Sequence, residues 1–296
     1  MGMSGARTLG SPAPLVGVGL MLLAMAILPG IDVMAKHLGS LGFPVIQIVW
    51  ARLFFGGLFT LPFALRHGVA ALWPDRPWLH ALRGSLLIAA TFSFFLSVQY
   101  LPIADALAIF FVQPLVLTAL SPVVLGERVG PRRWAAVLVG FLGTLIIIRP
   151  GIVEVSPGAV AALAAGTFLA LYFLITRRIS GRQPAMVTTF QTNLMGGLIA
   201  TALVLPVFVM PGWQVWLEFA ALGAVANLGH YLIVRAYDFA EASLLAPLAY
   251  TEMITSTLLG WLFFSDFPDR WTFVGVAVLI ACAIYISMRE RAQAVR

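Results

Sequence analysis

The amino-acid sequence predicts an all-α membrane protein of ten transmembrane helices, arranged as two five-helix repeats of opposite orientation. Three observations carry this prediction: the composition, the apolar runs along the chain, and a similarity between its two halves. Of the 296 residues, 61% are apolar and 10% are charged, and the mean hydropathy is +0.98. A soluble domain carries about a quarter charged residues. This chain could not cover its own surface with polar groups in water, so a lipid bilayer is expected to be its solvent.

Ten apolar segments are long enough to cross a bilayer, whose hydrocarbon core of about 30 Å needs roughly 20 residues of helix. They are 14–37, 43–64, 78–99, 102–125, 132–149, 156–177, 184–207, 214–236, 242–264 and 270–288. The connections are short, so no soluble domain is expected. The first segment contains Ala24-Met25-Ala26, which resembles a signal-peptide cleavage site. Its apolar run continues past that point, and we therefore interpret it as a span.

The basic residues predict the orientation of these spans. The net charge is +6, and the arginines lie in short gaps between apolar runs, as topology determinants do. With the N-terminus in the cytoplasm, the cytoplasmic side receives Arg7, Arg66, Arg76, Arg83, Arg128, Arg132, Arg133, Arg177, Arg178, Arg182, Arg235, Arg289, Arg291 and Arg296. The outer side receives only Lys36, Arg149 and Arg270, while Arg52 falls inside a span. Both termini are therefore predicted to be cytoplasmic, and no nucleic-acid partner is expected.

The two halves of the chain resemble each other at an offset of about 140 residues. The matching pairs are Pro44 with Pro184, Gly56-Gly57 with Gly196-Gly197, and Ala104-Asp105-Ala106 with Ala240-Glu241-Ala242. This division predicts one repeat over residues 1–150 and another over 151–296. Because each repeat has an odd number of spans, the second enters the membrane from the opposite side. Inverted repeats of this kind are typical of transporters, although duplication can also serve folding alone.

The ten spans, the two repeats and the GERVGPRRW segment that ends at Trp134 resemble the EamA-type branch of the drug/metabolite transporter superfamily. Three stretches are most similar to its S-adenosylmethionine uptake group: Asp32-Val33-Met34-Ala35-Lys36, Arg83-Gly84-Ser85-Leu86-Leu87 and Phe267-Pro268-Asp269-Arg270. The sequence also resembles the riboflavin carriers of the same superfamily. One departure is Ile31, because members of the uptake group often have Asn before the Asp of the first span.

The resemblance implies a secondary active transporter of a small organic metabolite in the bacterial inner membrane, as a monomer or homodimer. S-adenosylmethionine, or a similar nucleoside-like or amino-acid-like solute, is the expected cargo. An amino-acid or drug exporter of the same superfamily is the alternative. The chain has no phosphate-binding GxxxxGK[ST] loop, so ATP hydrolysis is not expected. An intramembrane enzyme and a non-transporting scaffold are the rivals from other classes. The scattered histidines and the single Cys282 indicate no catalytic set, metal or cofactor.

Charged side chains inside the first two spans are the first candidates for a substrate site. Asp, Lys or Arg at the centre of a membrane helix costs about 2.5–3.5 kcal/mol, so such residues pair with one another or bind something. Pro29-Gly30 should bend the first span beside Asp32. Asp32 would then bind a cation or proton, and Arg52 would bind an anion. The alternative is a structural pair of Asp32 with Arg52 or with Lys36.

A second group of polar residues lies in spans 4, 7, 8 and 9. Glu252 is predicted near the middle of span 9, where it is either protonated or lines a cavity. The remaining candidates are Gln113, Gln191, Asn193, Asn227, His230 and Tyr250. Asparagine and glutamine in spans more often bond helix to helix, and His230 could relay a proton. Asp105 and Glu241 are interpreted as acids favoured at helix N-termini.

Overall fold

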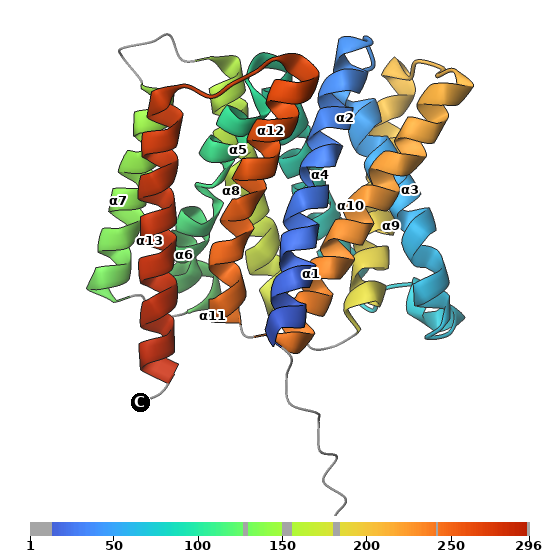
Figure 1. Ribbon diagram of the computed structural model, residues 1–296. Coiled ribbons are helices and arrows are strands. Elements are labelled where there is room, and N and C mark those ends of the chain that lie inside the picture. Colours follow the sequence, from blue (N-terminus) through green and yellow to red (C-terminus); the bar gives the residue numbers. More distant parts are fainter. Residues whose placement is uncertain (1–13, 127–129, 150–155, 180–183, 241, 295–296) are drawn as a thin grey trace, which may run out of the picture.

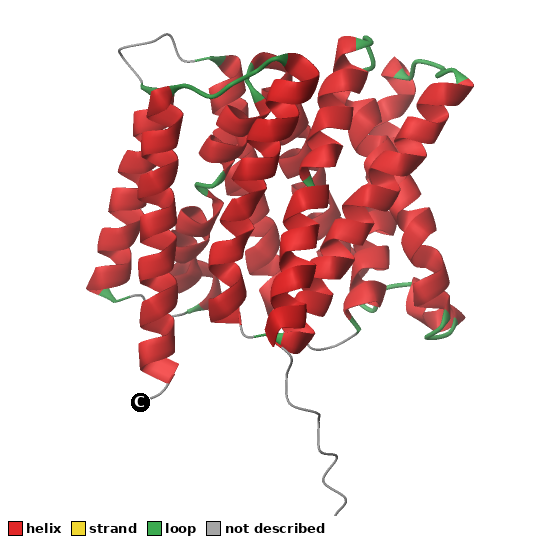
Figure 2. Ribbon diagram, viewed as in Figure 1, coloured by secondary structure: helices red, strands yellow, loops and turns green. Residues whose placement is uncertain are grey.

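The computed structural model describes residues 14–126, 130–149, 156–179, 184–240 and 242–294, and within these ranges the chain is helical, with short connecting loops (Figures 1 and 2). The first half contains α1 (Pro14–Ile27), α2 (Pro29–Ser40), α3 (Val45–Leu65), η1 (Val69–Leu72), α4 (Pro77–Tyr100), α5 (Ile103–Phe110), α6 (Gln113–Leu125) and α7 (Pro131–Ile148). The second contains α8 (Pro157–Ile179), α9 (Ala185–Val204), η2 (Leu205–Val207), α10 (Trp213–Phe239), α11 (Ala242–Leu245), η3 (Ala246–Thr251), α12 (Glu252–Phe264) and α13 (Arg270–Ala294).

Within these residues, seven helical stretches are long and apolar enough to cross a membrane, and Trp134–Ile148 and Arg270–Cys282 are shorter apolar helices. Large apolar side chains cover the outside of the bundle; Leu262 is 67% exposed and Val123 is 83% exposed. Such a surface fits contact with lipid. The protein is therefore a multi-pass membrane protein.

The bundle has two ends that are easily told apart in Figure 1. The described chain begins in α1 and finishes in α13 at the same end, which we call the proximal end. The loops between α2 and α3 and between α12 and α13 lie at the other, distal end. The α5–α6 stretch runs from the distal end into the bundle, whereas α11, η3 and α12 run in the opposite direction.

Three of the rods are interrupted part way along their length. α1 and α2 are separated at Leu28, just before Pro29, as the sequence predicts, because proline cannot complete the helical hydrogen-bond ladder. Phe111 and Val112 separate α5 from α6, and the 3₁₀ helix η3 separates α11 from α12. In a membrane such breaks occur where the released backbone groups are covered by protein or face a polar space.

Helices of one half pack mainly on helices of the other. The most extensive pairs are α4 with α8, α3 with α9, α7 with α13, and α10 with both α3 and α1. Glycines permit the close approach: a Cβ built on Gly84 would lie 2.7 Å from the backbone nitrogen of Gly196, and one on Gly223 equally close to that of Gly56. Gly56 and Gly196 belong to the glycine pairs that match between the two halves, and small residues of this kind let membrane helices pack closely.

Candidate functional site

Asp32 and Arg52 lie near each other inside the first repeat. Asp32 is in the first turn of α2, immediately after the break at Leu28, and is only 4% exposed. Arg52 lies on α3 and donates a hydrogen bond from Nη1 to Oγ1 of Thr91 on α4. The carboxylate of Asp32 and the guanidinium of Arg52 interact electrostatically. Arg52 thus donates to a neutral hydroxyl, and the ion pairs found among the described residues do not include the alternative pair of Asp32 with Arg52.

Glu252 and His230 join this pair from the second repeat. Glu252 is the first residue of α12, directly after the 3₁₀ helix η3, and its charge acts on Asp32. His230 lies on α10 and is exposed; its Nδ1 is 2.7 Å from the carbonyl oxygen of Ala226, so in this contact Nδ1 carries the proton and donates. Its ring lies within the field of Arg52. We call Asp32, Arg52, His230 and Glu252 the central cluster.

Lys36 does not belong to the central cluster. Its ammonium lies 2.5 Å from Oδ2 of Asp266 and 3.0 Å from the carbonyl oxygen of Leu101. It also lies 5.1 Å from the ring centre of Phe264. The expected alternative pairing with Asp32 is therefore wrong. Lys36 instead links α2 to the end of α4 and to the α12–α13 loop at the distal end.

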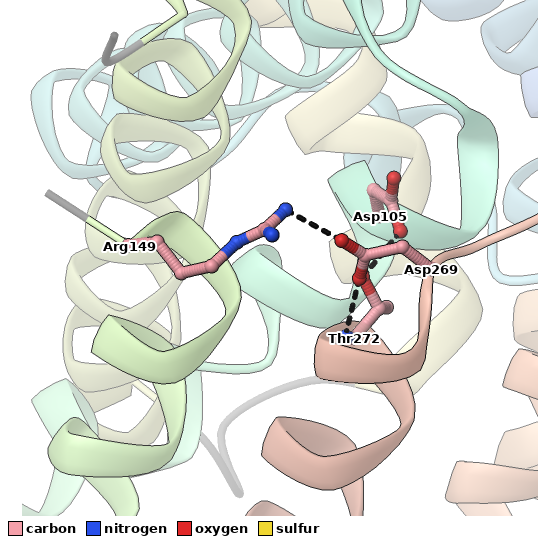
Figure 3. Close-up of polar contacts among 4 residues, drawn as sticks. All are labelled: Asp105, Arg149, Asp269 and Thr272. Carbon is pink, nitrogen blue, oxygen red and sulfur yellow. Dashed lines mark hydrogen bonds and ion pairs between the residues drawn. The ribbon is translucent and has the colours of Figure 1, made fainter. Parts of the chain in front are cut away.

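A second set of polar contacts also joins helices at the distal end (Figure 3). Nη2 of Arg149, which follows α7, lies 2.5 Å from Oδ2 of Asp269, which precedes α13. The Thr272 backbone donates to Oδ1 of Asp269 at 2.9 Å, and its hydroxyl donates to Oδ1 of Asp105 at 2.7 Å. Asp105 thus lies in the first turn of α5 as expected but contacts Thr272 and makes no side-chain cap bond. Glu241 lies outside the described residues.

The electrostatics of Asp269 follow from these contacts. Its partial burial raises the pKa, but the hydrogen bonds from Thr272 and the charge of Arg149 outweigh burial and hold the pKa below its ordinary value. The charged form is therefore the one that these partners stabilise. Together with Lys36 and Asp266, this arrangement ties both halves of the chain to each other at the distal end.

Asn193 and Asn227 contact each other rather than the charged groups. Nδ2 of Asn193 donates to Oδ1 of Asn227 at 3.2 Å, and Nδ2 of Asn227 donates to the Gly223 carbonyl at 2.9 Å. They are 7% and 8% exposed. Gln191, one helical turn before Met195 on α9, is fully buried. The two asparagines therefore bond helix α9 to α10, which is the alternative that sequence reasoning left open for them.

Tyr250 and the start of α6 lie together where two rods are interrupted. The rings of Phe111 and Tyr250 are 5.0 Å apart between centroids. Phe94 and Phe110 form another close pair at 4.9 Å. Gln113 begins α6 immediately after this turn and is partly buried. The break between α5 and α6 and the break at η3 therefore lie beside each other.

Sequence reasoning missed Tyr172 and misplaced Arg83. Arg83 was expected to be an orientation charge at the inner interface, but it is 2% exposed. Its Nη2 donates to the hydroxyl of Tyr172 at 3.2 Å, and Nε donates to Oγ1 of Thr176 at 3.1 Å. Tyr172 and Thr176 are four residues apart on α8 and therefore share one face of the helix. Two polar side chains on one face of an otherwise apolar span could have indicated a buried polar partner.

Comparison with known proteins gives a consistent result. The model of the EamA-like transporter family matches residues 15–149 and again 156–288. The S-adenosylmethionine uptake transporter of Rickettsia felis is 26% identical over 278 residues, which is 94% of each chain. The riboflavin transporter of Rhizobium johnstonii is 28% identical over 256 residues, covering 85% of this chain and 83% of that one. The pseudopaline exporter of Pseudomonas aeruginosa is 27% identical over 277 residues, covering 93% and 97%.

A solved crystal structure shares the fold. It aligns with a TM-score of 0.64 at 21% sequence identity and covers 96% of this chain and 99% of its own. The named relatives differ in the solute that they carry and include uptake and export proteins. The comparisons therefore point to transport rather than to an enzyme and leave the cargo to be argued from the residues.

Proposed function

This chain belongs to the EamA-like transporter family, and from that premise we propose that it is a secondary carrier working by alternating access in a bacterial inner membrane. It would have ten transmembrane helices, with repeats over 1–150 and 151–296 and both termini in the cytoplasm. The two family matches, the opposite directions of α5–α6 and α11–α12, and the arginine distribution support this topology.

The observation that carries the proposal is the central cluster. Asp32 and Arg52 come from the first half, and His230 and Glu252 from the second, so a solute bound among them would contact both repeats. Charged groups inside membrane proteins are costly unless they pair or bind something. Both acids also lie directly beside an interruption of a helix, at Leu28 and at η3, and irregular backbone inside a membrane protein is tolerated where protein covers it or where it lines a cavity. A site at the repeat interface is what alternating access requires.

The charges of the cluster restrict the cargo. With His230 neutral, two carboxylates and one guanidinium carry a net charge of about −1 when Asp32 and Glu252 are ionised. A complementary solute has one anionic and two cationic groups, or a proton occupies one of the acids. S-adenosylmethionine has a carboxylate, an ammonium and a sulfonium, so it matches the first case. Arg52 would bind the carboxylate, and the two acids would bind the cationic groups.

Two ion pairs join the repeats at the distal end, and we propose that they hold this end closed. Lys36 with Asp266, and Arg149 with Asp269, connect helices of opposite repeats. In the proposed topology the distal end is external, so this conformation corresponds to the state closed toward the outside. An amino-acid or metabolite exporter would use the same site and the same closure, since the distinction between uptake and export depends on the gradients.

The cargo is tested by ligand stabilisation of the purified protein in lipid nanodiscs. S-adenosylmethionine, S-adenosylhomocysteine, riboflavin and lysine would each be added while thermal unfolding is followed. A ligand at a hundredfold excess over its dissociation constant stabilises by about 2.7 kcal/mol. S-adenosylhomocysteine is the matched control, because it lacks the sulfonium charge and should stabilise less. Stabilisation by riboflavin alone would reject the charge argument and favour a neutral cargo.

The carrier function itself is tested in proteoliposomes. Uptake of labelled S-adenosylmethionine should saturate and should be lost in Arg52→Gln, because the carboxylate then has no cationic partner. Arg235→Gln is the matched control, since Arg235 is exposed and pairs with Asp238 on the surface. Equal uptake by the two variants would remove Arg52 from the site.

A further inference from the structure

Arg83 is a buried cation whose surroundings supply only neutral partners. Two of its nitrogens donate to the hydroxyls of Thr176 and Tyr172, and its guanidinium lies 5.2 Å from the centre of the Tyr172 ring. Its third nitrogen, Nη1, is buried and has no hydrogen-bond partner. In the part of the chain that the structure describes, no carboxylate lies within 4 Å of it. A charge in this condition destabilises the empty protein.

His80 increases the imbalance. It lies one helical turn before Arg83 on α4, is 7% exposed, and its Nδ1 also has no partner. The charge of Arg83 acts on His80. Two buried nitrogens on one face of α4 thus lack a partner, and buried polar groups in native proteins are normally satisfied. An oxygen-bearing group from outside the protein would satisfy the Nη1 donor of Arg83.

Tyr172 connects this place to the central cluster. Its side chain is half-buried, its hydroxyl accepts from Arg83, and it lies within the electrostatic range of Arg52. Arg52 contacts Thr91, eight residues after Arg83 on α4, which is about 12 Å along the helix. Arg83 is about 9 Å from the start of α4 by the same rise. Arg83 therefore lies between Arg52 of the central cluster and the proximal end.

We propose that Arg83, held by Tyr172 and Thr176, is a second binding site for the carboxylate of the cargo, between Arg52 and the proximal end. This rests on the proposed carrier function, which supplies a zwitterion with a carboxylate. A guanidinium binds a carboxylate through two parallel N–H donors, and Nη1 is available for one of them. The carboxylate of the solute would move from Arg52 to Arg83, and Tyr172 would lie beside it at both positions.

The site is tested by a binding measurement that needs no transport. Trifluoroacetate is added to purified protein in nanodiscs, and its ¹⁹F NMR line width is followed with concentration. The Arg52→Gln background removes the first site, so the remaining saturable broadening reports on Arg83. We expect Arg83→Gln in that background to weaken binding at least tenfold. Trifluoroacetamide, which is neutral, should show no saturable broadening in either protein.

A matched variant separates this site from a general effect of charge. Arg66→Gln, in the same background, removes an exposed arginine near the proximal end and should leave the broadening unchanged. Equal weakening by Arg66→Gln and Arg83→Gln, or no weakening by Arg83→Gln, would overturn the proposal. A wild-type protein that binds trifluoroacetate at Arg83 but transports nothing would instead reject the carrier function alone.

The unliganded stability distinguishes binding from simple packing. Arg83→Met keeps the length of the side chain and removes the buried charge. If Arg83 awaits a carboxylate, the melting temperature without ligand should rise or stay the same, because Thr176 retains its bond to the Tyr172 carbonyl. If Arg83 serves only to tie α4 to α8, the melting temperature should fall, and that result would refute the binding role.

Discussion

Replacing Asp266 by asparagine should open the distal end of the protein. Asn keeps the shape of the side chain but removes the charge that binds Lys36. The side chains of Lys36 and Asp266 are 16% and 28% exposed, so the pair lies between two known cases. Exposed pairs contribute about 0.2–1 kcal/mol, whereas breaking a buried pair costs about 3–5 kcal/mol. For this partly buried pair we take a value of about 1.5 kcal/mol, which corresponds to roughly a tenfold change in an equilibrium constant.

The shift can be read from the reactivity of a cysteine placed on α12. Ser256 is fully buried and lies one helical turn beyond Glu252, and Ser256→Cys is nearly isosteric. Cys282, the only native cysteine, is first replaced by serine. In nanodiscs, Asp266→Asn should then raise the labelling rate of the new thiol by a polar reagent about tenfold.

The control for this experiment is Asp238→Asn, which removes an exposed ion pair with Arg235 and should not change the rate. If Asp266→Asn leaves a folded protein whose labelling rate is unchanged, the pair does not close the distal end. The reasoning would also fail if both variants raised the rate equally, since loss of any acidic group would then suffice.

Three further predictions concern the closure, the packing and the coupling. The pKa of Asp269 is lowered in the folded protein, so its ionised form stabilises the fold above the unfolded pKa of about 3.9, and this stabilisation is lost as pH falls through the lower folded pKa. The melting temperature should therefore fall less between pH 6 and pH 3 in Asp269→Asn than in the wild type. Gly84→Ala should destabilise by about 1–3 kcal/mol, because its Cβ meets the Gly196 backbone, whereas Gly197→Ala, with its nearest neighbour 4.0 Å away, should unfold at nearly the wild-type temperature. An imposed pH gradient should accelerate uptake by the wild type and have no effect on Glu252→Gln; wild-type uptake that ignores the gradient would contradict proton coupling.

Composition and periodicity determined the class of this protein and most of its helices. The apolar runs alone required a bilayer, and Pro29 predicted the break between α1 and α2 because proline lacks a backbone donor. The glycine pairs marked the similarity of the two halves, and two of their members, Gly56 and Gly196, lie where helices pack closely. These features are local, since they follow from side chains within a few residues of one another, and local features can be read from one sequence.

The partners of the charged residues were decided only by the tertiary structure. The spacing of Asp32 and Lys36 on one helix suggested a pair, yet Lys36 binds Asp266, which lies 230 positions away along the chain. Arg83 was predicted to be one of the cytoplasmic charges that set the orientation of the spans, yet its side chain is buried against α8. An arginine has the same place in a hydropathy pattern whether it faces lipid headgroups or another helix. The sequence therefore determined that charges enter the membrane, and the packing of the two halves determined which of them meet, because each contact depends on helices that are distant in the chain.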